Sequence, residues 1–327
     1  MITRENIIAL FREFSELNVK EISDKLNISR QTVHTILNSL LDEKLVEKLG
    51  RSPKTVYRLK GSQQSAQPVI PEIAETDKKF LEKNFLVVND SGEMLEGIEA
   101  FDYWCRQRKL PVLKTLDEFK ITKQKYEQYY DANGNINGLD KLKNTKGYEK
   151  IWLDELYYLD FYAIERFGKT KLGNLLHYAK QGQNKFLMSV MQKEIAPRII
   201  QFVKLHKADA IGFVPPTIRR EVQIMKYIQS HLRIPLPVIE IKKLSGLIPV
   251  PQKSLSKLDE RIRNAENTFA ITEQRRFKHI ALIDDAVGSG STLNQIAGKI
   301  KVKQVAEKIT GLAVVGSFKG FDVITDV

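Results

Sequence analysis

The sequence predicts an α/β protein in which a small helical domain with a β-hairpin precedes a larger domain built on a doubly wound parallel sheet. Residues 1–60 contain three stretches with helical apolar spacing and then two short alternating segments. From about residue 150, apolar strand-like segments alternate with helical ones. Between these parts, residues 61–76 are polar and contain two prolines, which is typical of a linker.

The composition is that of a globular protein. The chain is 42% apolar, which excludes a disordered protein. Its longest apolar runs, such as Ile280–Ile283, are far shorter than the roughly 20 residues of a membrane span, and no signal peptide follows Met1. Cys105 is the single cysteine, which excludes an internal disulfide and a cysteine-based zinc site. We expect a soluble, cytoplasmic protein with no membrane partner.

Positive charge is concentrated in the C-terminal half. The formal net charge is +12: residues 1–60 carry +3, residues 185–280 carry +10 and the remaining residues carry −1. A field of this sign favours a polyanion, either a nucleic acid or a phosphorylated small molecule. Ordinary surface lysines are the alternative explanation.

The N-terminal elements carry local signals. Apolar residues around 7–11 begin the first helix, and the second covers residues 19–26, with Asn18 and Glu21 placed as an N-cap and its N3 partner. Ser29 can cap a third helix. Two strand-like segments then flank a turn: residues 45–49, 50–54 and 55–59.

This order of elements resembles the winged helix-turn-helix family over about 60 residues, and "VKEISDKLNISRQTVHTILNSLLDEKLV" is similar to its usual pattern. The resemblance implies that the third helix enters the major groove of double-stranded DNA. The residues expected to contact base edges are Arg30, Gln31, Thr32 and His34. In the wing, Arg51 and Lys54 would lie near phosphates. A dimerisation or docking module is the alternative role.

Residues 77–150 suggest elements but no family. A strand is expected at 85–88, a turn at 89–92 and a helix at 100–108. The stretch DANGNING, residues 131–138, invites comparison with a calcium loop. Ile136 and Leu142 occupy the positions where that loop requires glycine and glutamate, so the Asn-Gly pairs indicate a tight turn instead.

The later segments alternate in type. Helical spacing covers 172–202, and a helix also passes through 225–228. Strands are expected at the following segments: 210–214, 237–241, 280–283 and 312–315.

The strongest chemical signal is HIALIDDAVGSGSTLNQIA, residues 279–297. An apolar strand ends in Asp284 and Asp285, and a small-residue loop then opens a helix at about Thr292. Glycines let backbone N–H groups approach a phosphate, and the helix N-terminus favours an anion. No lysine follows the second glycine and the acids precede the loop, which excludes a Walker loop and a dinucleotide fingerprint.

This pattern resembles the motif with which type I phosphoribosyltransferases bind 5-phosphoribosyl 1-diphosphate (PRPP). The resemblance implies that Asp284 and Asp285 hold the ribose hydroxyls. It implies that the 5′-phosphate is held by the loop residues Gly288, Ser289, Gly290, Ser291 and Thr292. Mg²⁺ would arrive with PRPP, with either acid as a candidate ligand.

The resemblance extends to ComF-like proteins over residues 155–320. "ADAIGFVPPTIRR" is similar to their pyrophosphate loop, which gives Pro215 and Pro216 a PRPP-binding role. "PQKSLSKLDERIRNAENTFAI" carries their pattern of Gln252, Leu255, Arg261, Asn264 and Phe269. The expected catalytic residues are Asp284, Asp285, Lys253 and Arg261. Further positive charge could come from Lys257, Arg219 and Arg220. Unlike most ComF proteins, this chain has no cysteine-rich zinc module.

The expected domains are therefore a winged helix (1–60), a linker (61–76), an unassigned region (77–150) and a phosphoribosyltransferase-like domain (151–327). This arrangement also resembles the purine operon repressors, which join the same two domain types. We expect a homodimeric, PRPP-responsive DNA-binding protein. The alternatives are an active phosphoribosyltransferase with a docking winged helix, and an adaptor with an inactive ligand pocket. Phe318 and Phe321 could stack on an acceptor base or pack in the core.

Overall fold

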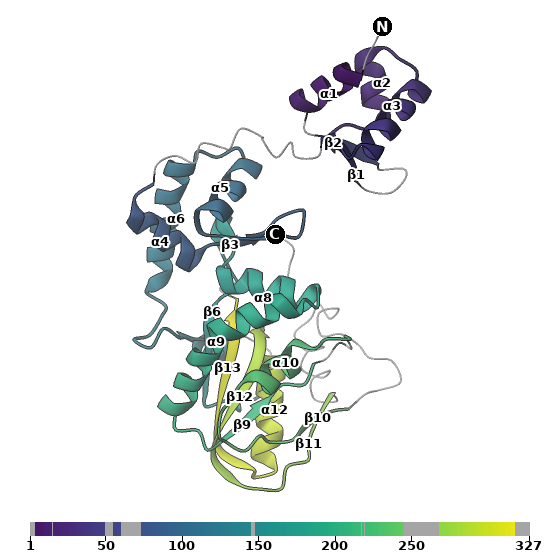
Figure 1. Ribbon diagram of the computed structural model, residues 1–327. Helices are drawn as coiled ribbons and strands as arrows, with labels where there is room; N and C mark the ends of the chain where they lie inside the picture. The colour runs from purple at the N-terminus through teal and green to yellow at the C-terminus, as the bar shows by residue number, and fades with distance from the viewer. Residues whose placement is uncertain are drawn as a thin grey trace. The chain divides into compact units, whose positions relative to one another are not determined.

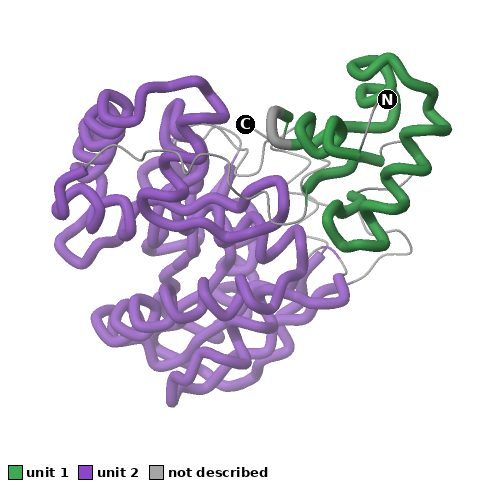
Figure 2. The backbone as a smooth tube through the Cα atoms, turned by 45° about the horizontal axis from the view of Figure 1, so that its top comes forward, with its two compact units in different colours: residues 1–72 green, residues 73–327 purple. Residues whose placement is uncertain are grey.

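The chain forms two compact units, residues 1–72 and residues 73–327 (Figure 2). The computed structural model describes residues 4–14, 16–49, 55–59, 73–144, 148–216, 218, 220–244 and 268–317. Within these residues, no helix combines the length and apolar character that crossing a membrane requires.

The first unit contains the three helices and the hairpin that the sequence predicts. Its elements are α1 (Arg4–Glu13), α2 (Val19–Leu26), α3 (Arg30–Asp42), β1 (Val46–Leu49) and β2 (Val56–Leu59). Both predicted caps are confirmed. Asn18 and Glu21 form a reciprocal capping box at the start of α2, and the Ser29 hydroxyl accepts a hydrogen bond from the backbone N–H of Thr32 at the start of α3.

One apolar cluster holds this unit together. Its fully buried members include Ile7, Ile22, Val33, Leu37 and Leu40, which come from all three helices. The hairpin joins this cluster, because an isolated bridge pairs Leu17 with Tyr57 of β2 and brings the Tyr57 ring into the interior. Burial on the inner face leaves the outer face of α3 exposed.

The second unit is built on a five-stranded sheet of order β5-β6-β13-β12-β9 (Figure 1). The strands of the whole unit, within and outside this sheet, are β3 (Leu86–Val88), β4 (Met94–Glu96), β5 (Ile136–Asn137), β6 (Glu155–Phe161), β7 (Ala163–Ile164), β8 (Gly168–Lys169), β9 (Ala210–Phe213), β10 (Ile241–Lys243), β11 (Phe269–Ile271), β12 (Phe277–Val287) and β13 (Ala306–Gly316). The pairs β6–β13, β13–β12 and β12–β9 are parallel, as predicted for the sheet, although no strand was expected at the position of β6. The expectation of an entirely parallel sheet was wrong, because β5 pairs antiparallel with β6.

The helices of this unit are α4 (Glu75–Asn84), α5 (Gly97–Gln107), α6 (Val112–Glu127), α7 (Leu139–Asn144), the 3-10 helix η1 (Glu165–Phe167), α8 (Lys171–Gln181), α9 (Lys185–Leu205), α10 (Ile224–His231) and α12 (Ser291–Val302). Those that cover the two faces of the sheet include α8, α9 and α12, whereas α4, α5 and α6 form a separate group (Figure 1). On one face, α8 and α9 pack against Ile211, Ala281 and Ile283 (Figure 1). On the other face, α12 lies close to the sheet. A Cβ atom added to Gly311 of β13 would lie only 3.3 Å from Cδ1 of Leu293 in α12.

Three boundaries differ from the sequence prediction. The helical stretch 172–202 is two helices, because α8 ends at Gln181 and Asn184 caps α9. The strand expected at 237–241 is reduced to one bridge between Val238 and Ile211, since Pro237 has no N–H to donate. The linker is shorter than expected: Glu75 and Thr76 belong to α4, whose first turn is acidic, as a helix N-terminus favours.

The region 77–150 is part of the second unit rather than a separate body. Its helices enclose an aromatic cluster in which the Phe85, Phe101 and Phe119 rings meet edge-on or tilted, with centroids 4.9–5.7 Å apart. Leu86 extends this cluster into the core beneath α8. The predicted turn in DANGNING is confirmed: the Asp131 carboxylate accepts hydrogen bonds from the N–H groups of Asn133 and Asn135.

Candidate functional sites

The outer face of α3 presents the side chains expected to contact DNA. Arg30, Gln31, Thr32 and His34 are all exposed. The Thr32 hydroxyl lies 2.9 Å from that of Ser29 and so belongs to the helix cap. Within the described part of the chain, Arg30 has no ion-pair partner, so its guanidinium can bind a ligand from solvent. Arg51 and Lys54, the expected wing contacts, lie outside the described residues.

The carboxyl edge of the larger sheet opens where β9 separates from β12. Their pairing ends at Phe213 and Ile283, whereas β12 continues beside β13 as far as Val287. The predicted strand end at Asp284 was therefore too early, because β13 still pairs with β12 past both acids. The N–H of Val214 donates to the carbonyl of Ile283 at 2.9 Å, which fixes the start of the Pro215–Pro216 loop beside the acids. Both prolines are half-buried.

Asp284 and Asp285, the acid pair, extend from β12 to opposite faces of the sheet, because successive strand residues alternate. Asp285 is buried and its two oxygens lie 2.8 and 2.6 Å from the Lys180 ammonium of α8. Asp284 is half-buried. Burial and the nearby Asp285 charge raise the pKa of Asp284 to about 7, and Lys180 partly opposes this shift. Asp284 can therefore hold or release a proton near neutral pH.

The loop after β12 begins α12 with its backbone in a left-handed conformation at Gly290, where φ is +80°. A side chain at this position would be strained and would also approach Leu142 of α7 to 2.9 Å. Ser289 and Ser291 are buried, with their hydroxyls 2.9 Å apart. Gly288 and Thr292 are half-buried, so they are the loop residues with the most access to solvent.

Four residues near this edge escape sequence reasoning, because each contacts a segment that is distant in the chain. Lys180 contacts Asp285, and Tyr148 donates its hydroxyl proton to the carbonyl of Ser289 at 2.8 Å. Lys141 donates to the carbonyl of Ser317 at 2.6 Å, at the end of β13, and burial lowers the pKa of Lys141 to about 8. Asn294, fully buried in α12, binds the backbone at Lys150 and Trp152. Contacts that link segments more than a hundred residues apart leave no periodic signal in the sequence.

Several expected residues fall outside the described part of the chain. These are Arg219, Gln252, Lys253, Leu255, Lys257, Arg261, Asn264, Phe318 and Phe321. Two others are placed. Phe269 is fully buried in β11, where it has a packing role. Arg220 donates to the side-chain oxygen of Gln181 at 3.1 Å, so it contacts the end of α8.

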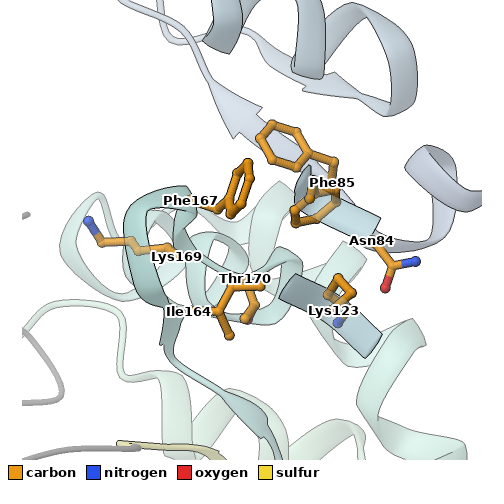
Figure 3. A pocket seen from close by; sticks show the side chains of 8 residues that line it. Asn84, Phe85, Lys123, Ile164, Phe167, Lys169 and Thr170 are labelled. Atoms are coloured by element: carbon orange, nitrogen blue, oxygen red, sulfur yellow. The ribbon is translucent and has the colours of Figure 1, made fainter. Parts of the chain in front are cut away.

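A small pocket lies apart from this edge, among α4, α6 and the segment from β7 to α8 (Figure 3). Its lining residues are Asn84, Phe85, Phe119, Lys123, Ile164, Phe167, Lys169 and Thr170. None of the site residues expected from the sequence lines it. Figure 3 shows the Phe85 and Phe167 rings on one side of it and the Lys123 and Lys169 side chains on others.

A comparison with curated proteins finds no match. Residues 7–55 match the MarR family, a segment that runs from α1 to the start of β2. Together with the three helices, the hairpin and the exposed face of α3, this match identifies the module. The N-terminal unit is a winged helix similar to those of the MarR family, and this similarity indicates a DNA-binding protein.

Proposed function

We propose that this protein is a DNA-binding regulator whose α/β unit binds PRPP with Mg²⁺ at the carboxyl edge of its sheet. The observation that carries this proposal is the meeting of two loops. The segment after β9, fixed by the hydrogen bond from Val214 to Ile283, lies beside the acid pair, and β12 leads directly into the N-terminus of α12. In parallel sheets, ligands bind where neighbouring strands separate at this edge.

Each part of this edge suits one part of PRPP. The N-terminus of α12, with Gly288 and Thr292 accessible, suits a phosphate, because its backbone N–H groups and helix dipole attract an anion. Asp284 suits a sugar hydroxyl, since a carboxylate accepts strong charge-assisted hydrogen bonds. Asp284 would hold the Mg²⁺ that accompanies the ligand, because this cation prefers carboxylate and phosphate oxygens, and the ion would offset the negative charge of the pyrophosphate.

The winged helix supplies the regulatory output in this proposal. Arg30 and Gln31 would distinguish bases in the major groove, and Arg51 and Lys54 would bind phosphates. PRPP would alter DNA affinity by favouring one arrangement of the protein, which requires a differential binding free energy of ~1–3 kcal/mol.

Calorimetric titration with PRPP and Mg²⁺ tests the ligand. We expect binding by the wild type and a loss of more than about tenfold in affinity for Asp284→Asn, because a charge-assisted contact is worth about 1.5–3 kcal/mol. Asp90→Asn, the same change in an exposed turn, is the matched control and should bind as the wild type does. Equal affinity of Asp284→Asn and wild type would overturn the proposed site. Ribose 5-phosphate and pyrophosphate alone show which half of the ligand is recognised.

Two further measurements separate a regulator from an enzyme. DNA affinity is measured by fluorescence anisotropy with and without saturating PRPP and Mg²⁺ at fixed ionic strength, and we expect it to change. Pyrophosphate release is followed in the same mixtures with candidate acceptor bases. Release without any change in DNA affinity would favour the alternative, an active phosphoribosyltransferase whose winged helix is a docking module.

A further inference from the structure

Lys180 is the one cation that the structure places directly on the acid pair within the described residues. Its ammonium lies 2.8 Å from Oδ1 and 2.6 Å from Oδ2 of Asp285, so it binds both oxygens of this carboxylate. The Lys180 and Asp285 side chains are only 17% and 11% exposed, which strengthens their attraction compared with a surface pair. A divalent cation that chelates Asp285 would have to displace this ammonium.

The position of Lys180 is fixed by the helix that carries it. Leu176 and Ala179, its neighbours on α8, are buried against the sheet. The end of the same helix also holds the chain that follows the Pro215–Pro216 loop. There, Gln181 accepts a hydrogen bond from Arg220, and Gln183 accepts one from the backbone N–H of Val222. One helix end thus fixes both a charge beside the acid pair and the segment that lines the other side of the opening.

We propose that Lys180 is a positioning residue that neutralises Asp285. The site then presents a single carboxylate, Asp284, and takes its divalent cation together with a phosphorylated ligand rather than holding a metal of its own. This inference rests on the proposed function for the identity of that ligand. Its basis is the ion pair itself and the fixed end of α8.

Charge gives the physical reason. Two ionised carboxylates beside each other would repel a ligand that carries phosphate and pyrophosphate groups. They would also bind a divalent cation when that ligand is absent. With Lys180 on Asp285, the three groups carry at most one net negative charge. A cation that screens the pyrophosphate can then approach Asp284 without prior binding to the protein.

The first test measures PRPP affinity as a function of Mg²⁺ concentration. We expect Lys180→Met to lower affinity about tenfold at limiting Mg²⁺ and to recover part of it at high Mg²⁺, where added cation replaces the lost charge. Lys180→Arg keeps the charge and should restore near wild-type affinity. Lys171→Met, which removes a lysine from the other end of α8, is the matched control. A loss of affinity that is the same at all Mg²⁺ concentrations would overturn the proposal.

The second test needs no PRPP and uses Mn²⁺ alone, followed by electron paramagnetic resonance. We expect Lys180→Met to gain a Mn²⁺ site that the wild type and Lys180→Arg lack and that the double variant Lys180→Met/Asp285→Asn loses. If Lys180→Met binds Mn²⁺ no better than the wild type, the proposed role of Lys180 is wrong. If the wild type binds no PRPP, the proposed function fails, and the Mn²⁺ result still decides the role of Lys180. Lys180→Gln, which keeps a hydrogen-bond donor without the charge, replaces Lys180→Met if circular dichroism shows that the methionine variant does not fold.

Discussion

The side-chain oxygen of Asn294 in α12 accepts a hydrogen bond from the backbone N–H of Trp152 at 2.7 Å. The amide nitrogen of the same side chain donates to the carbonyl of Lys150 at 2.9 Å, and the residue is fully buried. The backbone N–H of Asn294 in turn donates to the carbonyl of Gly290 at 2.9 Å. One side chain therefore ties the segment before β6 to the first turn of the helix that follows the candidate phosphate loop.

We expect Asn294→Ala to lower the free energy of unfolding by about 2–3 kcal/mol. The N–H of Trp152, a half-buried residue, would lose its partner, which costs more than the lost bond alone, and the carbonyl of Lys150, an exposed residue, would lose its bond as well. Urea denaturation measures the change. Gln295→Ala, the neighbouring half-buried position, is the control and should cost less than about 1 kcal/mol. A similar cost for both variants would show that the Asn294 bridge contributes little.

The raised pKa of Asp284 predicts a stability that depends on pH. Folding favours the protonated carboxyl, so this contribution is full below about pH 4, the range of an unfolded aspartate. It is lost as the pH rises through about 7, the pKa of Asp284 in the folded protein. Asp284→Asn should therefore stabilise the protein by about 2 kcal/mol at alkaline pH and by almost nothing at acidic pH. This stabilisation is about half of what the whole pKa shift would give, because Asp284 is partly open to solvent.

Thermal unfolding at a series of pH values checks this difference. The control is Asp90→Asn, which should follow the wild-type curve at every pH. A variant Asp284→Asn that is less stable than the wild type at alkaline pH would contradict the prediction.

Glu155 in β6 predicts the opposite dependence. Burial alone would raise the pKa of Glu155, but hydrogen bonds from Lys308 and Thr310 outweigh this effect and lower it. The stability that these bonds supply is present above about pH 4.3, the pKa of an unfolded glutamate, and is lost as the pH falls through the lower folded value. Glu155→Gln should cost about 1 kcal/mol at neutral pH, with the difference disappearing in acid. Denaturant titrations at both pH values measure it, and Glu307→Gln, an exposed position on β13, should show no such convergence.

Arg30 at the start of α3 should govern the choice of DNA sequence. We expect Arg30→Ala to weaken binding to the preferred duplex by about 1–3 kcal/mol and to leave non-specific binding much less affected. Selection from a random duplex pool identifies the preferred site, and anisotropy measures both affinities. Lys44→Asn removes an equal charge just beyond α3, at a left-handed position that asparagine tolerates, and should not change the preference. Equal losses on all duplexes would assign Arg30 to the phosphate backbone instead.

The parts of the structure that could be predicted are those set by residues close together in the sequence. Asn18 and Glu21 signal the start of α2 because the capping box is complete within four residues. The strand at 280–283 and the loop from Gly288 are also local patterns. By contrast, β5 has only two residues, too few for a periodic signal, and the chain positions of Lys180 and Asp285 differ by 105. The break between α8 and α9 did have a signal, since Gly182 and the capping residue Asn184 interrupt the apolar pattern.

The two borders of the large sheet are both occupied by short segments of the same chain. Beside β6, the two residues of β5 pair with Tyr157 and Tyr158. Beside β9, Ile211 exchanges hydrogen bonds with Pro237 and Ile239, at 3.0 and 2.8 Å. Unpaired strand borders recruit strands from other molecules and so promote aggregation, and these short segments block that route at the points where they pair. Where these segments pair, the sheet of one molecule therefore cannot extend into the next.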